Sequence, residues 1–430
     1  MVAKSKRNLY ICTGNFEPAN MKILYHAGVG LYTLAIRTAA LFGNNKAALW
    51  VKGRSGLFQT MARALKPGEK RIWMHCASLG EYEQGRPLFE EIRKRNPEHK
   101  LVLTFFSPSG YEIRKNDSLP HYIFYLPSDS PSHARKFLDL VMPEKAFFVK
   151  YEFWYFYLKE LNKRKIDTYL ISANFREDQI FFKKAGAWYR SLLMLFTHIF
   201  VQNERSERLL RSAGIVHTSV SGDTRFDRVS KIAANAKSLP EVEAFAKGAW
   251  CIVAGSTWPP DEEILINYMN NTPFPVKAII APHEIYPQRI QKLKESFTID
   301  TVCYSEKEKP EFASARVLII DNIGLLSSLY RFGKVALIGG GFGKGIHNTL
   351  EAATFRLPVL FGPYYGKFQE AVDLTKIGGA FSINEYKGFA AKVNSYYEKP
   401  DLQIEEGKKA GDYVSRHIGA TEKIIAKTGL

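Results

Sequence analysis

Residues 335–351 have the sequence VALIGGGFGKGIHNTLE, and this stretch decides the fold class. Val335–Ile338 is a short apolar run with the length of a buried strand, and five glycines lie between positions 339 and 345. Glycines leave backbone N–H groups open to a ligand, and the N-terminus of the following helix can hold a phosphate. The spacing matches neither GxGxxG nor the P-loop, and no Ser or Thr follows Lys344 to bind magnesium. The stretch predicts a nucleotide-binding loop in an α/β unit.

The same alternation of short apolar runs and helical patterns extends in both directions from this loop. It predicts parallel sheets with helices on both faces. The alternation pauses over residues 231–248, where we expect a linker between a first domain over 46–230 and a second over 249–430. Two doubly wound units place a cleft between them that suits two substrates. The predicted strands are Ile72–Ala77, Leu101–Phe106, Tyr122–Tyr125, Ala146–Val149, Thr168–Ser172, His198–Val201, Cys251–Ala254, Ala278–Ala281, Val317–Ile320, Val335–Ile338 and Pro358–Leu360.

The chain is basic and poor in cysteine. Its 60 Lys and Arg against 43 Asp and Glu give a formal net charge of +17, which favours an anionic partner. Charge alone does not distinguish nucleic acid, a membrane or a phosphorylated substrate, but no nucleic-acid-binding motif is present. The four cysteines form no CxxC pair and no metal-ligand spacing, which fits a reducing compartment and predicts no metal site.

An apolar stretch near the N-terminus, Ile23–Phe42, has about the length of a bilayer span. Arg37 makes it a poor free-standing span, so a membrane-associated helix over 21–45 is expected, either monotopic or with its polar stripe packed on protein. A cleaved signal peptide and a buried amphipathic helix are the alternatives. Basic residues after the helix keep the body of the protein on the cytoplasmic side. Residues 1–20 are expected to be an extension before a native start at Met21. The polar stripe consists of His26, Gly30, Thr33 and Arg37.

A carboxylate lies at the turn after the first strand, where the sequence runs Ser78-Leu79-Gly80-Glu81. Gly80 lets the backbone approach a ligand, and a positioned carboxylate at this point can act as a general base. A Glu that opens a helix also interacts with the helix dipole, which lowers its pKa. From position alone, a plain capping role and a catalytic role for Glu81 are equally supported.

Other strand ends of the first domain carry groups that could contact a substrate. Ser107 and Ser109 open a helix with Gly110, where they can hold a phosphate through the backbone, although an ordinary N-cap is the more economical interpretation. Glu152 follows the fourth strand among aromatic residues, where it could contact a sugar, position the surroundings of Glu81, or pair with Lys150.

Several residues at the strand ends of the second domain could contact a ligand. Ser256 ends its first strand, and His283 ends its second strand, where a histidine can contact a ligand. Asn348 and Glu351 lie three residues apart and share one helical face. A carboxylate there can take both hydroxyls of a ribose, although a capping contact is the alternative. The density of glycine just before them favours nucleotide binding.

Taken together, these segments resemble the family of Kdo transferases, which add 3-deoxy-D-manno-octulosonic acid (Kdo) to the lipid A precursor of Gram-negative bacteria. The family's Ser-x-Gly-Glu turn, hydroxyl-rich turn, Gly-x-x-Lys-Phe-Asp segment, Ser-Thr stretch with paired Glu, and His-Asn-x-Leu-Glu signature all have counterparts here. Arg225 stands where the family has Lys. The counterparts are Ser78–Glu81, Ser107–Gly110, Gly222–Asp227, Ser256–Glu263 and Gly339–Glu351.

The resemblance implies a GT-B fold and an inverting, metal-independent transfer of Kdo from CMP-Kdo to the lipid A precursor, lipid IVA. It implies no cofactor, and a location on the cytoplasmic face of the inner membrane, beside an anionic lipid surface. A GT-B enzyme that uses a UDP-sugar is the alternative, and a nucleic-acid-binding protein is a more distant one. Glu81 is the implied base; the implied donor-binding residues are Arg225, Ser256, His283, Gly340, Gly341, Asn348 and Glu351, and the implied acceptor-binding residues are Ser78, Gly80, Ser107, Ser109 and Glu152.

The chain departs from the family pattern at three places. The family's Pro-Arg-His is Pro282-His283 here, which leaves Arg289 as a candidate replacement for the arginine. The family's Asn-Ala-Arg is Ser172-Ala173-Asn174, and Lys150 stands where the family often has a carboxylate. These departures concern the contacts to phosphate and carboxylate more than the base.

Overall fold

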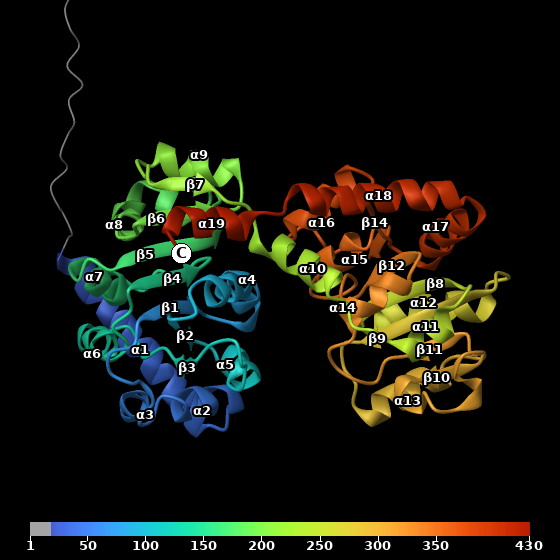
Figure 1. The fold of residues 1–430 in the computed structure, drawn as a ribbon, viewed down its shortest axis with the longest axis horizontal. Helices are drawn as coiled ribbons and strands as arrows, with labels where there is room; N and C mark the ends of the chain where they lie inside the picture. The colour runs from blue at the N-terminus through green and yellow to red at the C-terminus, as the bar shows by residue number, and fades with distance from the viewer. Residues whose placement is uncertain (1–18) are drawn as a thin grey trace, which may run out of the picture. The chain divides into compact units, whose positions relative to one another are not determined.

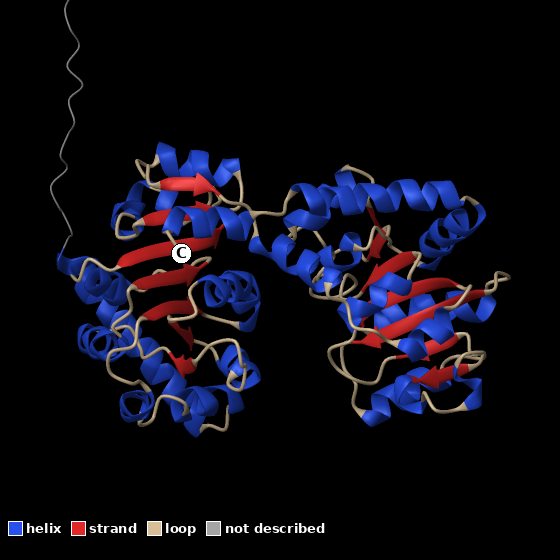
Figure 2. Ribbon diagram, in the orientation of Figure 1, coloured by secondary structure: helices blue, strands red, loops and turns tan. Residues whose placement is uncertain are grey.

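A computed structural model describes residues 19–430 of the chain. The chain forms two compact units: unit 1 is the chain up to Gly222 together with Thr421–Leu430, and unit 2 is Asp223–Ala420 (Figure 1). The predicted extension over 1–20 lies outside the described residues except for its last two, which begin the first helix. Each unit contains a seven-stranded parallel sheet with helices on both faces (Figure 2).

Unit 1 has the strand order β3-β2-β1-β4-β5-β6-β7. Its strands are β1 (Arg71–Cys76), β2 (Lys100–Phe105), β3 (Tyr122–Tyr125), β4 (Lys145–Val149), β5 (Asp167–Ala173), β6 (His198–Val201) and β7 (Thr218–Val220). Its helices are α1 (Ala19–Leu41), α2 (Asn45–Lys52), α3 (Leu57–Ala64), α4 (Leu79–Arg95), α5 (Pro108–Arg114), α6 (Pro131–Val141), α7 (Tyr155–Lys163), α8 (Ala187–Leu193), α9 (Glu204–Ser212) and α19 (Ala420–Thr428).

Unit 2 has the strand order β10-β11-β9-β8-β12-β13-β14. Its strands are β8 (Trp250–Thr257), β9 (Val276–Pro282), β10 (Thr301–Cys303), β11 (Val317–Ile319), β12 (Val335–Ile338), β13 (Val359–Phe361) and β14 (Ala380–Ser382). Its helices are α10 (Thr224–Ala234), α11 (Pro240–Ala246), α12 (Pro259–Asn271), α13 (Pro287–Glu295), α14 (Leu326–Leu329), α15 (Leu350–Thr354), α16 (Gln369–Lys376), α17 (Tyr386–Glu398) and α18 (Pro400–Arg416).

The central strands are mostly apolar because both faces of each sheet are covered, and buried polar exceptions such as His75 and Thr104 are hydrogen-bonded to each other. Along β1, Trp73 contributes to one apolar core and Ile72 and Met74 contribute to another on the opposite face. Along β12, Ala336 and Val335 divide in the same way between two cores. Side chains of a strand alternate between the faces of the sheet, so a strand buried on both sides is apolar at most of its positions.

The unit boundary does not coincide with the sequence-based one. Residues 231–248, for which the sequence predicts a linker, contain α11, and Val242 and Phe245 of this helix are buried in a core of unit 2. Helix α19, which the sequence assigns to the second domain, packs Ile424 and Ile425 into a core of unit 1. Burial of apolar side chains, rather than the polar composition around them, decides which unit each segment joins.

Helix α1 packs on unit 1 through Met21 and Tyr25, and the Tyr25 hydroxyl donates to Asp129 Oδ2 at 2.6 Å. Of the predicted polar stripe, Gly30 and Arg37 are exposed, Thr33 is half-buried, and the His26 ring lies 5.4 Å from the ring of Phe156, so the stripe packs on protein only in part. Among residues 19–430, no helix combines the length and apolar character needed to cross a bilayer. Several large apolar side chains of α1 face solvent: Ile23, Leu24, Leu31, Leu34 and Leu41.

Candidate active site

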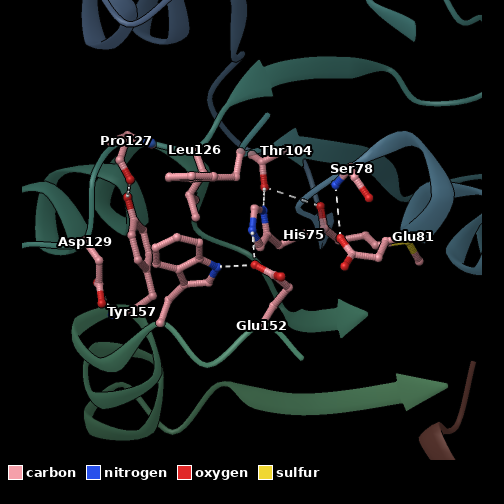
Figure 3. Close-up of polar contacts among 12 residues, drawn as sticks. His75, Ser78, Glu81, Thr104, Leu126, Pro127, Asp129, Glu152 and Tyr157 are labelled. Atoms are coloured by element: carbon pink, nitrogen blue, oxygen red, sulfur yellow. Dashed lines mark hydrogen bonds and ion pairs between the residues drawn. The ribbon is translucent and has the colours of Figure 1, made fainter. Parts of the chain in front are cut away.

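The turn between β1 and α4 holds Glu81 by a backbone contact. Ser78 is the extended residue before α4, and its N–H donates to Glu81 Oε2 at 3.0 Å (Figure 3). Gly80 is exposed, and a side chain there would meet nothing within 4 Å. The capping contact expected from sequence therefore exists, and the turn beside it is open enough for a ligand to approach.

The electrostatic surroundings of Glu81 outweigh the helix dipole. Burial of the carboxyl group and the negative charge of Glu152 raise the pKa of Glu81 from 4.5 to about 7, against backbone hydrogen bonds and Lys150, which lower it. The backbone N–H groups at the helix N-terminus lower this pKa as expected, but burial and the second carboxylate from another strand end outweigh them. A carboxylate with a pKa near neutrality is a more effective proton acceptor than an ordinary one.

Glu152 is held by a chain of buried donors on neighbouring strands. His75 Nε2 lies 3.2 Å from Glu152 Oε2, and Trp154 Nε1 donates to the same oxygen at 2.7 Å. On its other side, His75 Nδ1 lies 2.9 Å from Thr104 Oγ1, which accepts from Trp73 Nε1 at 2.8 Å. Figure 3 shows His75 between Thr104 and Glu152. His75 and Thr104 are fully buried, so this series of hydrogen bonds lies beneath the site.

The direction of these hydrogen bonds follows from what each group can donate. The indole N–H of Trp73 can only donate, so the Thr104 hydroxyl accepts from it and has its own proton for His75 Nδ1. This leaves the proton of a neutral His75 on Nε2, where it points to Glu152. Glu152 thus receives two donors, and its negative charge raises the pKa of Glu81.

The sequence analysis singled out Glu81 and Glu152 and did not predict the hydrogen-bond network behind Glu152. Glu152 was assigned to the acceptor side, whereas His75 and Thr104 lie inside apolar strands and carry no signal in the sequence. Ser107 and Ser109 lie at the N-terminus of α5, where Ser109 N–H donates to Ser107 Oγ at 3.1 Å. The N-cap interpretation is therefore confirmed for Ser107, and both hydroxyls stay exposed beside the same sheet edge.

In unit 2, the glycine loop follows β12 as the sequence predicts. Gly340 adopts the left-handed conformation with φ of 90°, and a side chain on Gly341 would lie 2.4 Å from the backbone nitrogen of Gly362. Asp261 anchors the loop from α12: its Oδ2 accepts from the N–H groups of Gly340 and Trp258, each at 2.9 Å. The sequence analysis did not predict this contact of Asp261 with the loop.

An aromatic stack stands beside the loop. The His283 ring lies 4.5 Å from the Trp258 ring and 4.6 Å from the His347 ring, with 26° between the planes in both pairs. Trp258 Nε1 donates to His347 Nε2 at 3.1 Å, so a neutral His347 carries its proton on Nδ1. Burial and the nearby His283 lower the pKa of His347, which favours the neutral ring. The predicted site residue His283 is thus joined by two rings that were not predicted as site residues.

Asn348 and Glu351 contact each other at the start of α15. Asn348 Oδ1 accepts from the N–H of Leu350 at 3.1 Å, and its Nδ2 donates to Glu351 Oε1 at 3.0 Å. Burial raises the pKa of Glu351. The capping contact that was the alternative to ribose binding is present, and a ribose role for Glu351 stays a prediction. Ser256, at the end of β8, has a left-handed backbone with φ of 54°.

The arginines predicted near the donor phosphate are paired with carboxylates. Arg225 Nη1 and Nη2 donate to the two oxygens of Glu370 at 2.8 and 3.2 Å, and its Nε donates to Asp223 at 2.9 Å. Arg289 forms an ion pair with the buried Glu262. Both guanidinium groups hold elements of unit 2 together, so a donor phosphate would have to share them. Within residues 19–430, no group of three or more His, Cys, Asp or Glu side chains has a metal-binding arrangement.

Solved structures with the same fold define the class. UDP-GlcNAc 2-epimerase from Neisseria meningitidis superposes with a TM-score of 0.57, covering 83% of this chain and 99% of that one at 17% sequence identity. MurG from Acinetobacter baumannii superposes with a TM-score of 0.51, covering 83% and 98% at 11% identity. At such low identity these likenesses show the fold alone. The chain has the GT-B fold, as predicted.

Sequence comparison narrows this class to one family. Residues 51–228 match the profile of the family described as 3-deoxy-D-manno-octulosonic-acid transferase. The transferase of that name from Aquifex aeolicus is 27% identical over 351 residues, 80% of this chain and 91% of the relative. The one from Chlamydia trachomatis is 25% identical over 335 residues, 73% and 75% of the two chains. The matched domain and these relatives support a Kdo transferase, which is a kind of glycosyltransferase.

Proposed function

We propose that this Kdo transferase takes Kdo from CMP-Kdo and transfers it to a hydroxyl of the lipid A precursor, with Glu81 as general base. The observation that carries the proposal is the Glu81 carboxylate, held at an open turn with a pKa of about 7. A capping carboxylate with no further role has no need of burial beside a second carboxylate.

The chemistry assigned to Glu81 is the removal of one proton. As the acceptor oxygen attacks the anomeric carbon of Kdo, Glu81 takes the hydroxyl proton, and the bond from that carbon to the CMP phosphate breaks on the opposite face. The configuration at the anomeric carbon therefore inverts. The charged Glu152 favours the protonated form of Glu81 that this step produces.

The second unit supplies what the leaving group requires. CMP departs with negative charge on its phosphate, and that charge is stabilised by backbone N–H groups aimed at it. The glycine loop before α15 has a backbone that a ligand can approach, with Gly340 and Gly341 at its start. We assign Ser256, His283 and the Asn348–Glu351 pair to the nucleotide and sugar of the donor, and we assign no cofactor.

The acceptor is a lipid, so the enzyme must work at a membrane surface. The exposed apolar side chains of α1 and the net charge of +17 fit binding to an anionic bilayer by a helix lying in its surface. We place the enzyme on the cytoplasmic face of the inner membrane.

The test is transfer by Glu81→Gln, with Glu90→Gln as the matched control. Glu90 lies on the same helix and forms a surface ion pair with Arg86 at 3.0 Å. With CMP-Kdo generated in the assay and the lipid A precursor as acceptor, we expect Glu81→Gln to lose about a hundredfold or more in kcat. CMP affinity, measured by calorimetry, should stay within twofold of wild type.

Two results would overturn the proposal. One is transfer by Glu81→Gln at the rate of Glu90→Gln. The other is a wild-type enzyme that forms no Kdo-lipid and instead binds and consumes a UDP-sugar.

A further inference from the structure

Two cavities of unit 1 adjoin each other beneath α1. The first, of about 440 Å³, lies between α1 and residues that follow β2 and β4. Its walls are mostly aromatic or small: Tyr25, Gly28, Val29, Tyr32, Phe106 and Trp154. Because the carboxyl ends of parallel strands share one edge of the sheet, this cavity opens on the edge that carries Glu81 and Glu152. Trp154 is both a wall of the cavity and a donor to Glu152.

The second cavity, of about 350 Å³, carries basic side chains among apolar ones. It shares Thr33, Trp50 and Ser128 with the first, and Arg37 and His133 also line it. Arg54 lies there too, but its guanidinium donates to three backbone carbonyls and so holds the wall in place. Arg37 is exposed and offers its charge to an anionic ligand.

Trp50, the residue common to both cavities, has an unused donor. Its side chain is 5% exposed, and its indole N–H has no hydrogen-bond partner among residues 19–430. A buried donor without an acceptor is costly, and such groups in native proteins usually mark a missing ligand or water. The ligand that fits has an acceptor oxygen at the junction between an apolar chain and an anionic head.

We propose that the first cavity holds one acyl chain of the acceptor, an acylated anionic lipid. The ester or amide carbonyl at the head of that chain accepts the Trp50 indole N–H, and an anionic group of the head faces Arg37. This inference rests on the proposed function and adds to it the position of the lipid. It places the head of the lipid near Glu152, the carboxylate that Trp154 contacts.

Helix α1 offers a matched pair of variants for the test. Gly28 lines the first cavity, whereas Gly30 lines neither, and a side chain added at either glycine meets nothing within 4 Å. Both glycines have helical backbones, where leucine is a better helix former than glycine, so both variants should fold. Gly28→Leu fills the cavity, and Gly30→Leu adds the same apolar bulk outside it.

The assay compares KM for the acylated lipid A precursor and for its deacylated disaccharide, both in detergent solution. We expect Gly28→Leu to raise KM for the acylated acceptor tenfold or more, with Gly30→Leu within twofold of wild type. Neither variant should change KM for the deacylated acceptor. Trp50→Phe, which keeps the ring and removes the N–H, should raise KM for the acylated acceptor about two- to tenfold.

Equal KM values of Gly28→Leu and Gly30→Leu for the acylated acceptor would overturn the inference, as would an unchanged KM in Trp50→Phe. A binding titration of the acylated acceptor without donor, followed by tryptophan fluorescence, separates this failure from that of the proposed function. If wild type binds the lipid, Gly28→Leu does not, and no Kdo is transferred by either, the cavity assignment holds and the proposed reaction fails.

Discussion

Replacing Glu81 by Gln is expected to stabilise unit 1 at alkaline pH while it abolishes transfer. The folded protein raises the pKa of Glu81 from 4.5 to about 7, so the folded state binds the proton more tightly than the unfolded state does. The stability that this proton contributes is fully present below pH 4.5 and is lost as pH rises through about 7. The difference between the two pKa values corresponds to about 3 kcal/mol, which partial exposure of the carboxyl reduces to about 2 to 3 kcal/mol.

The Gln side chain is neutral at every pH, so the variant does not lose the stability that wild type loses when Glu81 becomes charged. Its amide oxygen can still accept the Ser78 N–H, so the cap is kept. At pH 8.5 the variant should therefore be more stable than wild type by about 2 kcal/mol, and at pH 4.5 the two should be nearly equal. A Glu81 that acted as a helix cap alone would give the opposite sign, since loss of its charge at a helix N-terminus costs about 0.3 to 1 kcal/mol.

The assay is urea unfolding at pH 4.5 and 8.5, followed by far-UV circular dichroism and tryptophan fluorescence, with Glu90→Gln as control. Because the chain has two units, the unfolding transition of each unit is fitted separately. Each transition is assigned to a unit by the fluorescence change of that unit's tryptophans. The reasoning is refuted if Glu81→Gln is less stable than wild type at pH 8.5, or if its effect is the same at both pH values.

Three further outcomes follow from the site. In wild type, kcat/KM for transfer should rise with pH through a midpoint near 7. Glu152→Gln should move this midpoint lower because a neighbouring negative charge is removed. A pH profile from 5 to 9 with an unmoved midpoint would contradict the coupling between the two carboxylates. Asp261→Ala leaves the backbone N–H groups of Gly340 and Trp258 unpaired. It should therefore lower the free energy of unfolding by about 2 to 4 kcal/mol and raise KM for the donor. Asp261→Asn, measured in the same assays, should have smaller effects on both quantities. Arg225→Met should destabilise unit 2 by about 3 to 5 kcal/mol because two buried carboxylates lose their partner, and a thermal unfolding curve equal to that of wild type would count against this structural role.

Much of the fold could be predicted from the apolar runs. The central strands carry mostly apolar residues because each is covered on two faces, and runs such as Val335–Ile338 match the observed strand without error. The strands that sequence reasoning missed, β7, β10 and β14, have three residues each and lie at sheet edges. So short a run has no periodicity to detect, and its extended form comes from pairing with the neighbouring strand.

The sequence by itself determined which residue types stand at the ends of the strands: Glu81 at an open turn, and glycines before Asn348 and Glu351. That was enough to indicate a family and a base. Only the tertiary structure decided the environment of each group, because charge, burial and hydrogen bonding act through space between residues distant in sequence. It buried Glu81 and brought Glu152 close to it, which together raise the Glu81 pKa, and it left the N–H of Trp50 without an acceptor beneath α1.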